Sequence, residues 1–156
     1  MRIRVADRRD VDVLSVLRTE FLTELRGLEP GQLPDQFVDE TRRFFSRAIN
    51  DGTIVSWLAE EDGTAIGLVS VLVQNAPPRP DDCRAFEGLI INMFVRQGER
   101  GRGIGGSLLQ SCLASGPDYG IRKFNLYATE AGRPLYLKEG FSTPDNWMVL
   151  RVPPES

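Results

Sequence analysis

The spacing of apolar and polar residues predicts helices and strands along the whole first half of the chain. Apolar positions recur at helical spacing over 11–25 and 37–49, and Asp7 and Asp35 stand where helix N-caps are expected. Gly27 and Gly52 are expected to end these two helices. Residues 2–5 predict a first strand. Two β-rich runs, 53–60 and 64–73, flank the turn sequence EDG and predict a hairpin.

The second half alternates predicted strands and helices. Residues 74–84 are rich in proline and predict an exposed loop, and 85–95 are almost wholly apolar, as is typical of a strand buried on both faces. A helix is expected from Ile104 to a stop at Gly116. The last predicted elements are a strand at 123–128, a short helix at 133–140 and a final strand at 147–152. This order indicates an α/β or mixed α+β fold.

Length and composition narrow the class of protein. The 156 residues fit a single domain over 1–156, and no apolar run approaches the ~18 residues of a membrane span. The first ten residues lack the apolar core of a secretory signal, so we expect a cytoplasmic protein with its two cysteines reduced. Histidine is absent, which removes the commonest general base, and no metal site is predicted.

Basic residues gather around one glycine-rich segment, RQGERGRGIGGSLLQ, which spans residues 96–110. Its arginines, at 96, 100 and 102, contrast with a net charge of −3, which favours a small anionic ligand over nucleic acid. A buried strand that feeds glycines and then a helix N-terminus can bind a phosphate, because the first N–H groups of a helix have no internal partner.

Three interpretations of this segment compete. Glycines 101, 103 and 106 spell the G-x-G-x-x-G of a dinucleotide site, with Glu130 as the acid after the next strand, yet residues 96–100 intervene where a tight turn is required. A Walker loop is excluded because no G-K-[ST] follows. The second interpretation is a flexible loop whose glycines only turn the chain.

The third interpretation rests on a resemblance. The segment MFVRQGERGRGIGGSLL is similar to the acetyl-CoA-binding motif of the GNAT superfamily of N-acetyltransferases, in which [RQ]-x-x-G-x-[GA] falls on Arg100, Gly103 and Gly105. A second segment, LYATEAGRPLYLKEGF at 126–141, resembles the later motif of that superfamily. The resemblance covers nearly the whole chain and implies an α/β (α+β) fold with a mixed, mostly antiparallel sheet that splays at the central strand.

The resemblance also implies how acetyl-CoA would bind. The backbone of Met93, Phe94 and Val95 would pair with the pantetheine arm, and Thr129 takes the place of an asparagine that contacts this arm in many relatives. The pyrophosphate would lie against the loop and the first helical turn, at Arg100, Gly101, Arg102, Gly103, Ile104, Gly105, Gly106 and Ser107.

Two proton movements are needed for direct transfer to an amine, because the amine must lose a proton and the thiolate gains one. The resemblance assigns the acid to Tyr136, whereas Tyr127 is interpreted as a packing residue. The base is open, since relatives carry it where Leu89 and Ile91 stand here. Glu87, Glu130 and a water chain that ends on a backbone carbonyl are the alternatives. Asn92 is interpreted as structural unless a bulge turns it.

The acceptor would be an amine of a small molecule or a peptide, in a pocket formed by the first two helices and the final strands. Glu20, Glu24 and Trp147 are candidates there, because carboxylates suit a cationic amine. A homodimer is compatible with this interpretation, and neither nucleic acid nor a membrane is expected as a partner. The rival functions are an acyl-CoA-binding sensor of the same fold without turnover and a nucleotide-binding module unrelated to CoA.

Overall fold

The computed structural model describes residues 1–83 and 86–154, and within them five strands form one mixed sheet. Their order across the sheet is β1 (Arg2–Val5), β2 (Ile54–Glu61), β3 (Thr64–Asn75), β4 (Phe86–Val95) and β5 (Ile121–Leu126). Neighbours are antiparallel from β1 to β4, whereas β5 runs parallel to β4. The predicted mixed, mostly antiparallel sheet is therefore confirmed. Arg84 and Ala85, at the junction of the predicted loop and strand, lie outside the described residues.

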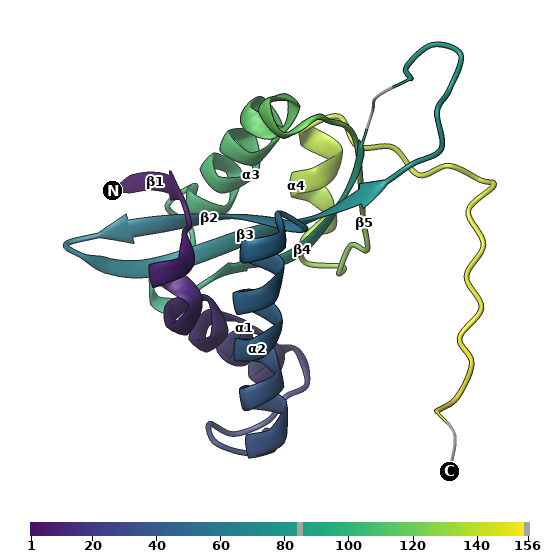
Figure 1. The fold of residues 1–156 in the computed structure, drawn as a ribbon. Coiled ribbons are helices and arrows are strands. Elements are labelled where there is room, and N and C mark those ends of the chain that lie inside the picture. The colour runs from purple at the N-terminus through teal and green to yellow at the C-terminus, as the bar shows by residue number, and fades with distance from the viewer. Residues whose placement is uncertain (84–85, 155–156) are drawn as a thin grey trace.

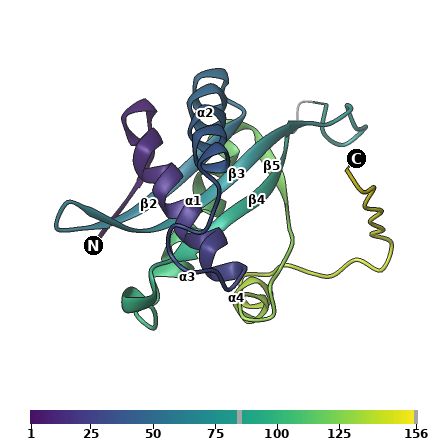
Figure 2. The same cartoon turned by 90° about the horizontal axis from the view of Figure 1, so that it is seen from below.

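Helices cover both faces of the sheet. Figures 1 and 2 show α1 (Val11–Leu25) and α2 (Asp35–Asp51) on one face, and α3 (Ile104–Ser115) and α4 (Arg133–Lys138) on the other. Leu14, Leu17 and Phe45 are fully buried on the α1 and α2 side, and Leu108 and Leu109 on the α3 side. The structure therefore has two apolar layers, one on each side of the strands.

The first two helices begin and end close to the predicted points. Asp7 accepts a 2.8 Å hydrogen bond from the Arg9 N–H and caps a short 3-10 turn, Arg8–Asp10, that continues into α1. The cap predicted at Asp35 is wrong, because Asp35 is the first residue of α2 and Pro34 holds the N-cap position without a side-chain hydrogen bond. Gly52 ends α2 in the left-handed conformation that glycine adopts without strain.

Some apolar positions of the helical pattern are exposed. Leu25 in α1 is 53% exposed and Phe44 in α2 is 37% exposed, so the inward stripe of each helix is narrower than the pattern predicts. The β4 strand also differs from prediction, since buried residues alternate along it with half-buried ones. The reason is that the second half of β4 borders a cavity.

The final predicted strand is wrong for residues 147–152. They have no regular structure, and Met148 and Leu150 are 92% and 88% exposed. Figure 1 shows this end of the chain running away from the sheet. A strand needs the hydrogen-bonding edge of another strand, and these described residues pair with none.

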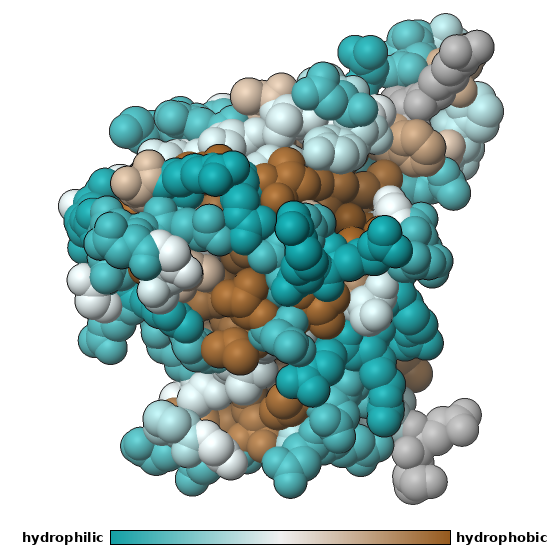
Figure 3. All heavy atoms as spheres, turned by 60° about the vertical axis from the view of Figure 1, so that its left-hand side comes forward, coloured by the Kyte–Doolittle hydropathy of each residue, from teal (hydrophilic) through white to brown (hydrophobic). Residues whose placement is uncertain are grey.

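The surface is mixed in character. On the face drawn in Figure 3, hydrophilic side chains surround apolar residues that show in patches across its middle. Among the described residues, no helix is both long enough and apolar enough to cross a bilayer.

Candidate active site

The central feature of the site is a split between β4 and β5. The parallel pairing begins at Phe86 opposite Ile121 and ends at Ile90 opposite Leu126, where β5 stops. On its other edge, β4 stays paired with β3 as far as Val95 opposite Gly67. In the described part of the chain, residues 91–95 thus have one edge that no strand covers, and the predicted splay of the sheet is present.

A bulge lies in the middle of this uncovered segment. Ser70 of β3 is opposite Ile91 and Leu68 is opposite Phe94, so one residue of β3 faces two of β4. Asn92 sits in the bulge with a φ of 56°, a conformation that asparagine tolerates better than most residues. Its side chain meets Arg18 of α1, which means that the bulge turns Asn92 toward the α1 face.

The glycine-rich loop connects β4 to the N-terminus of α3. Gly101 and Gly103 have φ of 81° and 76°, a left-handed conformation that costs most residues strain. A Cβ added to either glycine would meet nothing within 4 Å. The first hydrogen bond of α3 runs from the Ser107 N–H to the Gly103 carbonyl, which leaves the preceding N–H groups without helical acceptors. Loop and helix therefore present backbone donors, with room for an anion beside them.

One cavity of about 730 Å³ joins the split strand to the loop. It reaches from α1 to α4, and ten residues of the predicted cofactor and catalytic set line it: Met93, Phe94, Val95, Arg100, Gly101, Gly103, Ile104, Gly105, Thr129 and Tyr136. Segments separated by more than thirty residues in sequence thus meet around one space.

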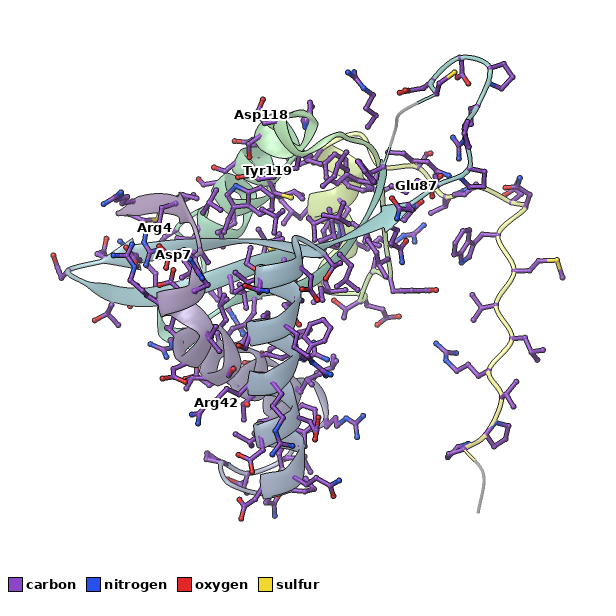
Figure 4. The ribbon with its side chains drawn as sticks, viewed as in Figure 1. Arg4, Asp7, Arg42, Glu87, Asp118 and Tyr119 are labelled. Carbon is purple, nitrogen blue, oxygen red and sulfur yellow. The ribbon has the colours of Figure 1, made fainter. Side chains whose placement is uncertain are left out.

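Four predicted site residues do not line this cavity. Gly106 and Ser107 lie on α3. Arg102 donates hydrogen bonds to Glu61 from Nη1 at 2.9 Å and from Nη2 at 2.7 Å, and Nη1 also contacts Glu99. Glu87 is at the start of β4, near the base of the loop 76–83, as Figure 4 shows. Its carboxylate pairs with Arg79 and with Lys123.

The electrostatics of Glu87 are those of a structural carboxylate. Burial alone would raise its pKa, but the hydrogen bond and charge of Lys123, with the charge of Arg79, bring the pKa below its usual value. A base with a lowered pKa takes up a proton poorly near neutral pH.

The arginines of the loop pair with acids on α1. Arg96 binds Glu20 through two hydrogen bonds of 2.8 Å, and Arg100 binds Glu24 at 2.7 Å. Glu20 and Glu24 were expected to face a cationic amine, and the structure instead shows them as partners of the loop. The four-residue spacing of Glu20 and Glu24 places both on one face of α1, but no local pattern links that face to the arginines of the loop.

Tyr136 lies on α4 against the apolar core. It is 8% exposed, its ring meets Phe141 edge-on at a centroid distance of 5.8 Å, and burial raises the pKa of its hydroxyl. The phenol is therefore protonated at neutral pH. Thr129 precedes α4, and its hydroxyl accepts a 3.1 Å hydrogen bond from the Gly132 N–H, so it helps to shape the turn into the helix.

Three further cavity residues were missed or misjudged. Tyr127 is 62% exposed and lines the cavity, which corrects its interpretation as a packing residue. Phe21 of α1 lines it too, beside Phe94 at a ring distance of 5.8 Å. Asn92 is the third: it was interpreted as structural unless a bulge turned it, and the bulge does turn it toward Arg18, at the wall of the cavity. Trp147 lines a separate cavity of about 380 Å³ that shares Tyr127 and Tyr136 with the first.

A sheet that splits beside a glycine-rich helix N-terminus is what the resemblance to the acetyl-CoA-binding acetyltransferases implies, and the comparisons with known proteins agree. The sequence profile of the acetyltransferase (GNAT) family matches residues 18–141. The chain therefore belongs to the GNAT family of acetyltransferases. This membership confirms the predicted family and the prediction of acetyl-CoA as cosubstrate. Among curated proteins, no sequence matches this chain significantly.

Solved structures resemble the chain over nearly its full length. A predicted acetyltransferase from Clostridium acetobutylicum, crystallised with acetyl-CoA, is 30% identical, with a TM-score of 0.82 over 96% of this chain and 95% of its own. A GCN5-related N-acetyltransferase from Ralstonia eutropha JMP134 is 27% identical, with a TM-score of 0.78 over 97% of each chain. Glucosamine-6-phosphate N-acetyltransferase from Arabidopsis thaliana, at 21% identity and a TM-score of 0.69 over 97% of this chain and 99% of its own, shares the fold.

Proposed function

We propose that the protein transfers the acetyl group of acetyl-CoA to an amine directly, within a ternary complex. The observation that carries this proposal is the position of Tyr136, a buried phenol on the wall of the cavity that also contains the uncovered edge of β4. When bound, acetyl-CoA supplies the activated acetyl group as a thioester.

The residues of the split strand and the loop fit this cosubstrate. The uncovered backbone of Met93, Phe94 and Val95 offers hydrogen-bonding groups to an extended pantetheine arm. The N–H groups that follow Gly103, with Arg100 beside them, would hold the pyrophosphate, because a helix N-terminus favours negative charge. A backbone N–H of the β4 segment would also polarise the thioester carbonyl, where the oxyanion develops during transfer. Fixed donors at such an oxyanion are worth several kcal/mol, roughly a hundredfold or more in rate.

Tyr136 is the proton donor in this proposal. A phenol with a raised pKa stays protonated at neutral pH and can give its Oη proton to a departing thiolate. The surrounding apolar side chains of α3 and α4 keep bulk water away from it.

The proposal assigns no side chain as the base. Glu87 is paired with cations outside the main cavity, and Glu130 is exposed and also outside it. Glu24 lines the cavity, but its carboxylate binds Arg100. We therefore assign the loss of the amine proton to a water chain, held by backbone carbonyls of the cavity, that passes the proton to bulk solvent.

Thiol release from acetyl-CoA against amines, amino acids, polyamines and peptides tests the proposal. Turnover with an amine and an N-acetylated product by mass spectrometry is the expected result. Calorimetry with CoA should be run in parallel. Tight binding without turnover on any acceptor would favour the sensor, and stabilisation by NAD without CoA binding would contradict the cofactor assignment.

A further inference from the structure

Among residues 1–83 and 86–154, one partly buried cation has no carboxylate partner. Among the described residues, three basic residues are partly buried: Arg4, Arg18 and Arg96. Arg4 binds Asp10 and Glu60, and Arg96 binds Glu20. Arg18 has no acidic group within 4.0 Å among the described residues, and its hydrogen bond goes to the neutral amide of Asn92.

This arrangement is unfavourable unless something completes it. Moving a charge from water into a protein costs free energy that a paired opposite charge offsets. Burial lowers the pKa of Arg18, and no neighbouring charge acts in the other direction. Arg42, Arg96 and Arg100 meet α1 from other segments, and each pairs with an acid of this helix: Asp12, Glu20 and Glu24 respectively. Arg18 is thus the exception on this face.

Asn92 adds a second incomplete group at the same place. It is 3% exposed, it lines the cavity, and its Nδ2 is a buried side-chain donor for which the described structure provides no acceptor. Its Oδ1 is already taken by Arg18, so the amide points its free N–H groups elsewhere. A cation and an adjacent unsatisfied donor together match an oxyanion.

We propose that Arg18 and Asn92 bind a carboxylate of the acceptor, which makes the acceptor an amine that carries a carboxylate a few bonds from its nitrogen. This inference rests on the proposed function, because it places the acceptor in the cavity of the acetyl transfer. Asn92 directly precedes Met93, the first residue expected to pair with the cosubstrate, and one residue of strand spans about 3.3 Å. If the carboxylate of the acceptor is bound at Asn92, an amine that is a few bonds away in the same molecule therefore lies beside the uncovered edge of β4.

The charge and the surroundings favour a carboxylate over a phosphate group. Arg18 supplies one positive charge directly behind Asn92, and the residues that line the cavity around Asn92 include the apolar Phe21, Ile91 and Phe94. A phosphate dianion would leave one charge unpaired in this apolar environment. A polyamine would bring more positive charge beside Arg18, and we expect it to be a poor acceptor.

Matched acceptors test the inference by turnover. Amino acids, their carboxamides and an aminophosphonate such as aminomethylphosphonate should be assayed with acetyl-CoA on the wild-type protein, Arg18→Gln and Arg26→Gln. Arg26→Gln is the control, because it removes the charge of an exposed arginine at the C-cap of the same helix, α1. We expect Arg18→Gln to raise KM for the carboxylate acceptors at least about tenfold, as for one charge-assisted hydrogen bond, and to leave KM for acetyl-CoA within twofold. Faster turnover of the carboxamides than of the amino acids by the wild-type protein would overturn the inference, as would an equal loss of activity on both kinds of acceptor in Arg18→Gln. A preference for the aminophosphonate would also overturn it and would assign the anion to the phosphate class.

A second measurement does not depend on turnover. In the CoA complex, the Arg18 side-chain N–H resonance, assigned by its loss in Arg18→Gln, should shift on titration with glycine and not with glycinamide. Equal shifts of the resonance with glycine and glycinamide would contradict carboxylate binding. So would the absence of a shift with glycine and with every other amino acid titrated in the same way. If glycine shifts the resonance but no amine is acetylated, the proposed transfer fails while the binding site stands.

Discussion

The side chain of Arg100 donates a 2.8 Å hydrogen bond from Nε to the backbone carbonyl of Val95, across the turn that joins β4 to the glycine-rich loop. Its guanidinium also lies 5.7 Å from the centre of the Phe94 ring and pairs with Glu24. One arginine thus connects the end of the split strand, the loop and helix α1. The neighbouring Arg102 lies on the same loop but turns to Glu61, away from the cavity.

Arg100→Gln is expected to weaken CoA binding about tenfold or more, because it removes a charged donor and loosens the loop from β4. Arg102→Gln is the matched variant and should weaken binding less than threefold, since its guanidinium is held by Glu61 outside the cavity. Isothermal titration calorimetry with CoA measures both. Equal losses would show that the loop binds through its overall charge rather than through the position of Arg100.

Tyr136→Phe should lower kcat at least about tenfold and leave the affinity for CoA nearly unchanged, because only the acidic hydroxyl is removed. The raised pKa of Tyr136 also predicts a pH profile. An acid works while protonated, so activity should persist on the alkaline side to a pH above the ordinary phenol pKa of 10.0 before this group deprotonates.

Tyr127→Phe is the control for this experiment, since Tyr127 lines the same cavity but is largely exposed. Its kcat should remain within about threefold of the wild type. A normal kcat for Tyr136→Phe, or equal losses in both variants, would remove Tyr136 from the role of acid.

Much of the fold was predictable because its signals are local. Hydrophobic periodicity and turn residues place α1, α2 and the β2–β3 hairpin within a few residues of their observed bounds. The same kind of signal fails at 147–152, where a nearly continuous apolar run suits a strand, yet strand formation depends on a partner edge that no local pattern specifies.

The site was predictable where the motif determines the backbone and less so where distant segments meet. Gly101, Gly103 and Gly105 line the cavity as expected, but the pairs of Arg96 with Glu20 and of Arg100 with Glu24 join residues 76 positions apart. The bulge at Asn92 was equally hidden, because strict alternation places Asn92 on the face opposite Ile91, whereas the extra residue turns it toward Arg18.

Gly103→Val should abolish CoA binding while the protein remains folded. The residue has a φ of 76°, which costs a side chain with a branched Cβ about 1–3 kcal/mol, and the new side chain would project into the open space beside the cavity. Gly98→Ala is the control, because Gly98 also has open space around it but no positive φ. Thermal unfolding and CoA titration separate the two effects. Retained affinity in Gly103→Val would count against the pyrophosphate assignment.

The junction of β1 with α1, which positions Arg18, should weaken in acid. Arg4 donates two hydrogen bonds, of 2.8 and 2.7 Å, to the carboxylate of Asp10, which is 8% exposed and also accepts the Asp7 N–H at 2.8 Å. Figure 4 shows Arg4 and Asp7 together at this end of the sheet. The hydrogen bond from Arg4, with that from Asp7, holds the pKa of Asp10 below its ordinary value of 3.8 despite burial. The unfolded chain therefore binds the proton more readily, so this stabilisation is complete above about pH 4 and is lost as the pH falls through the folded pKa.

Asp10→Asn tests this dependence through the free energy of unfolding in urea between pH 7 and pH 2.5. At pH 7 the variant should be less stable by about 1–3 kcal/mol, because Arg4 loses a charged acceptor in a partly buried site. The difference from the wild type should shrink below about pH 4, where Asp10 of the native protein takes up a proton. Asp12→Asn is the matched control, since its carboxylate is 79% exposed and pairs with Arg42 at the surface. A pH-independent deficit in Asp10→Asn would mean that the junction depends on the shape of this side chain and not on its charge.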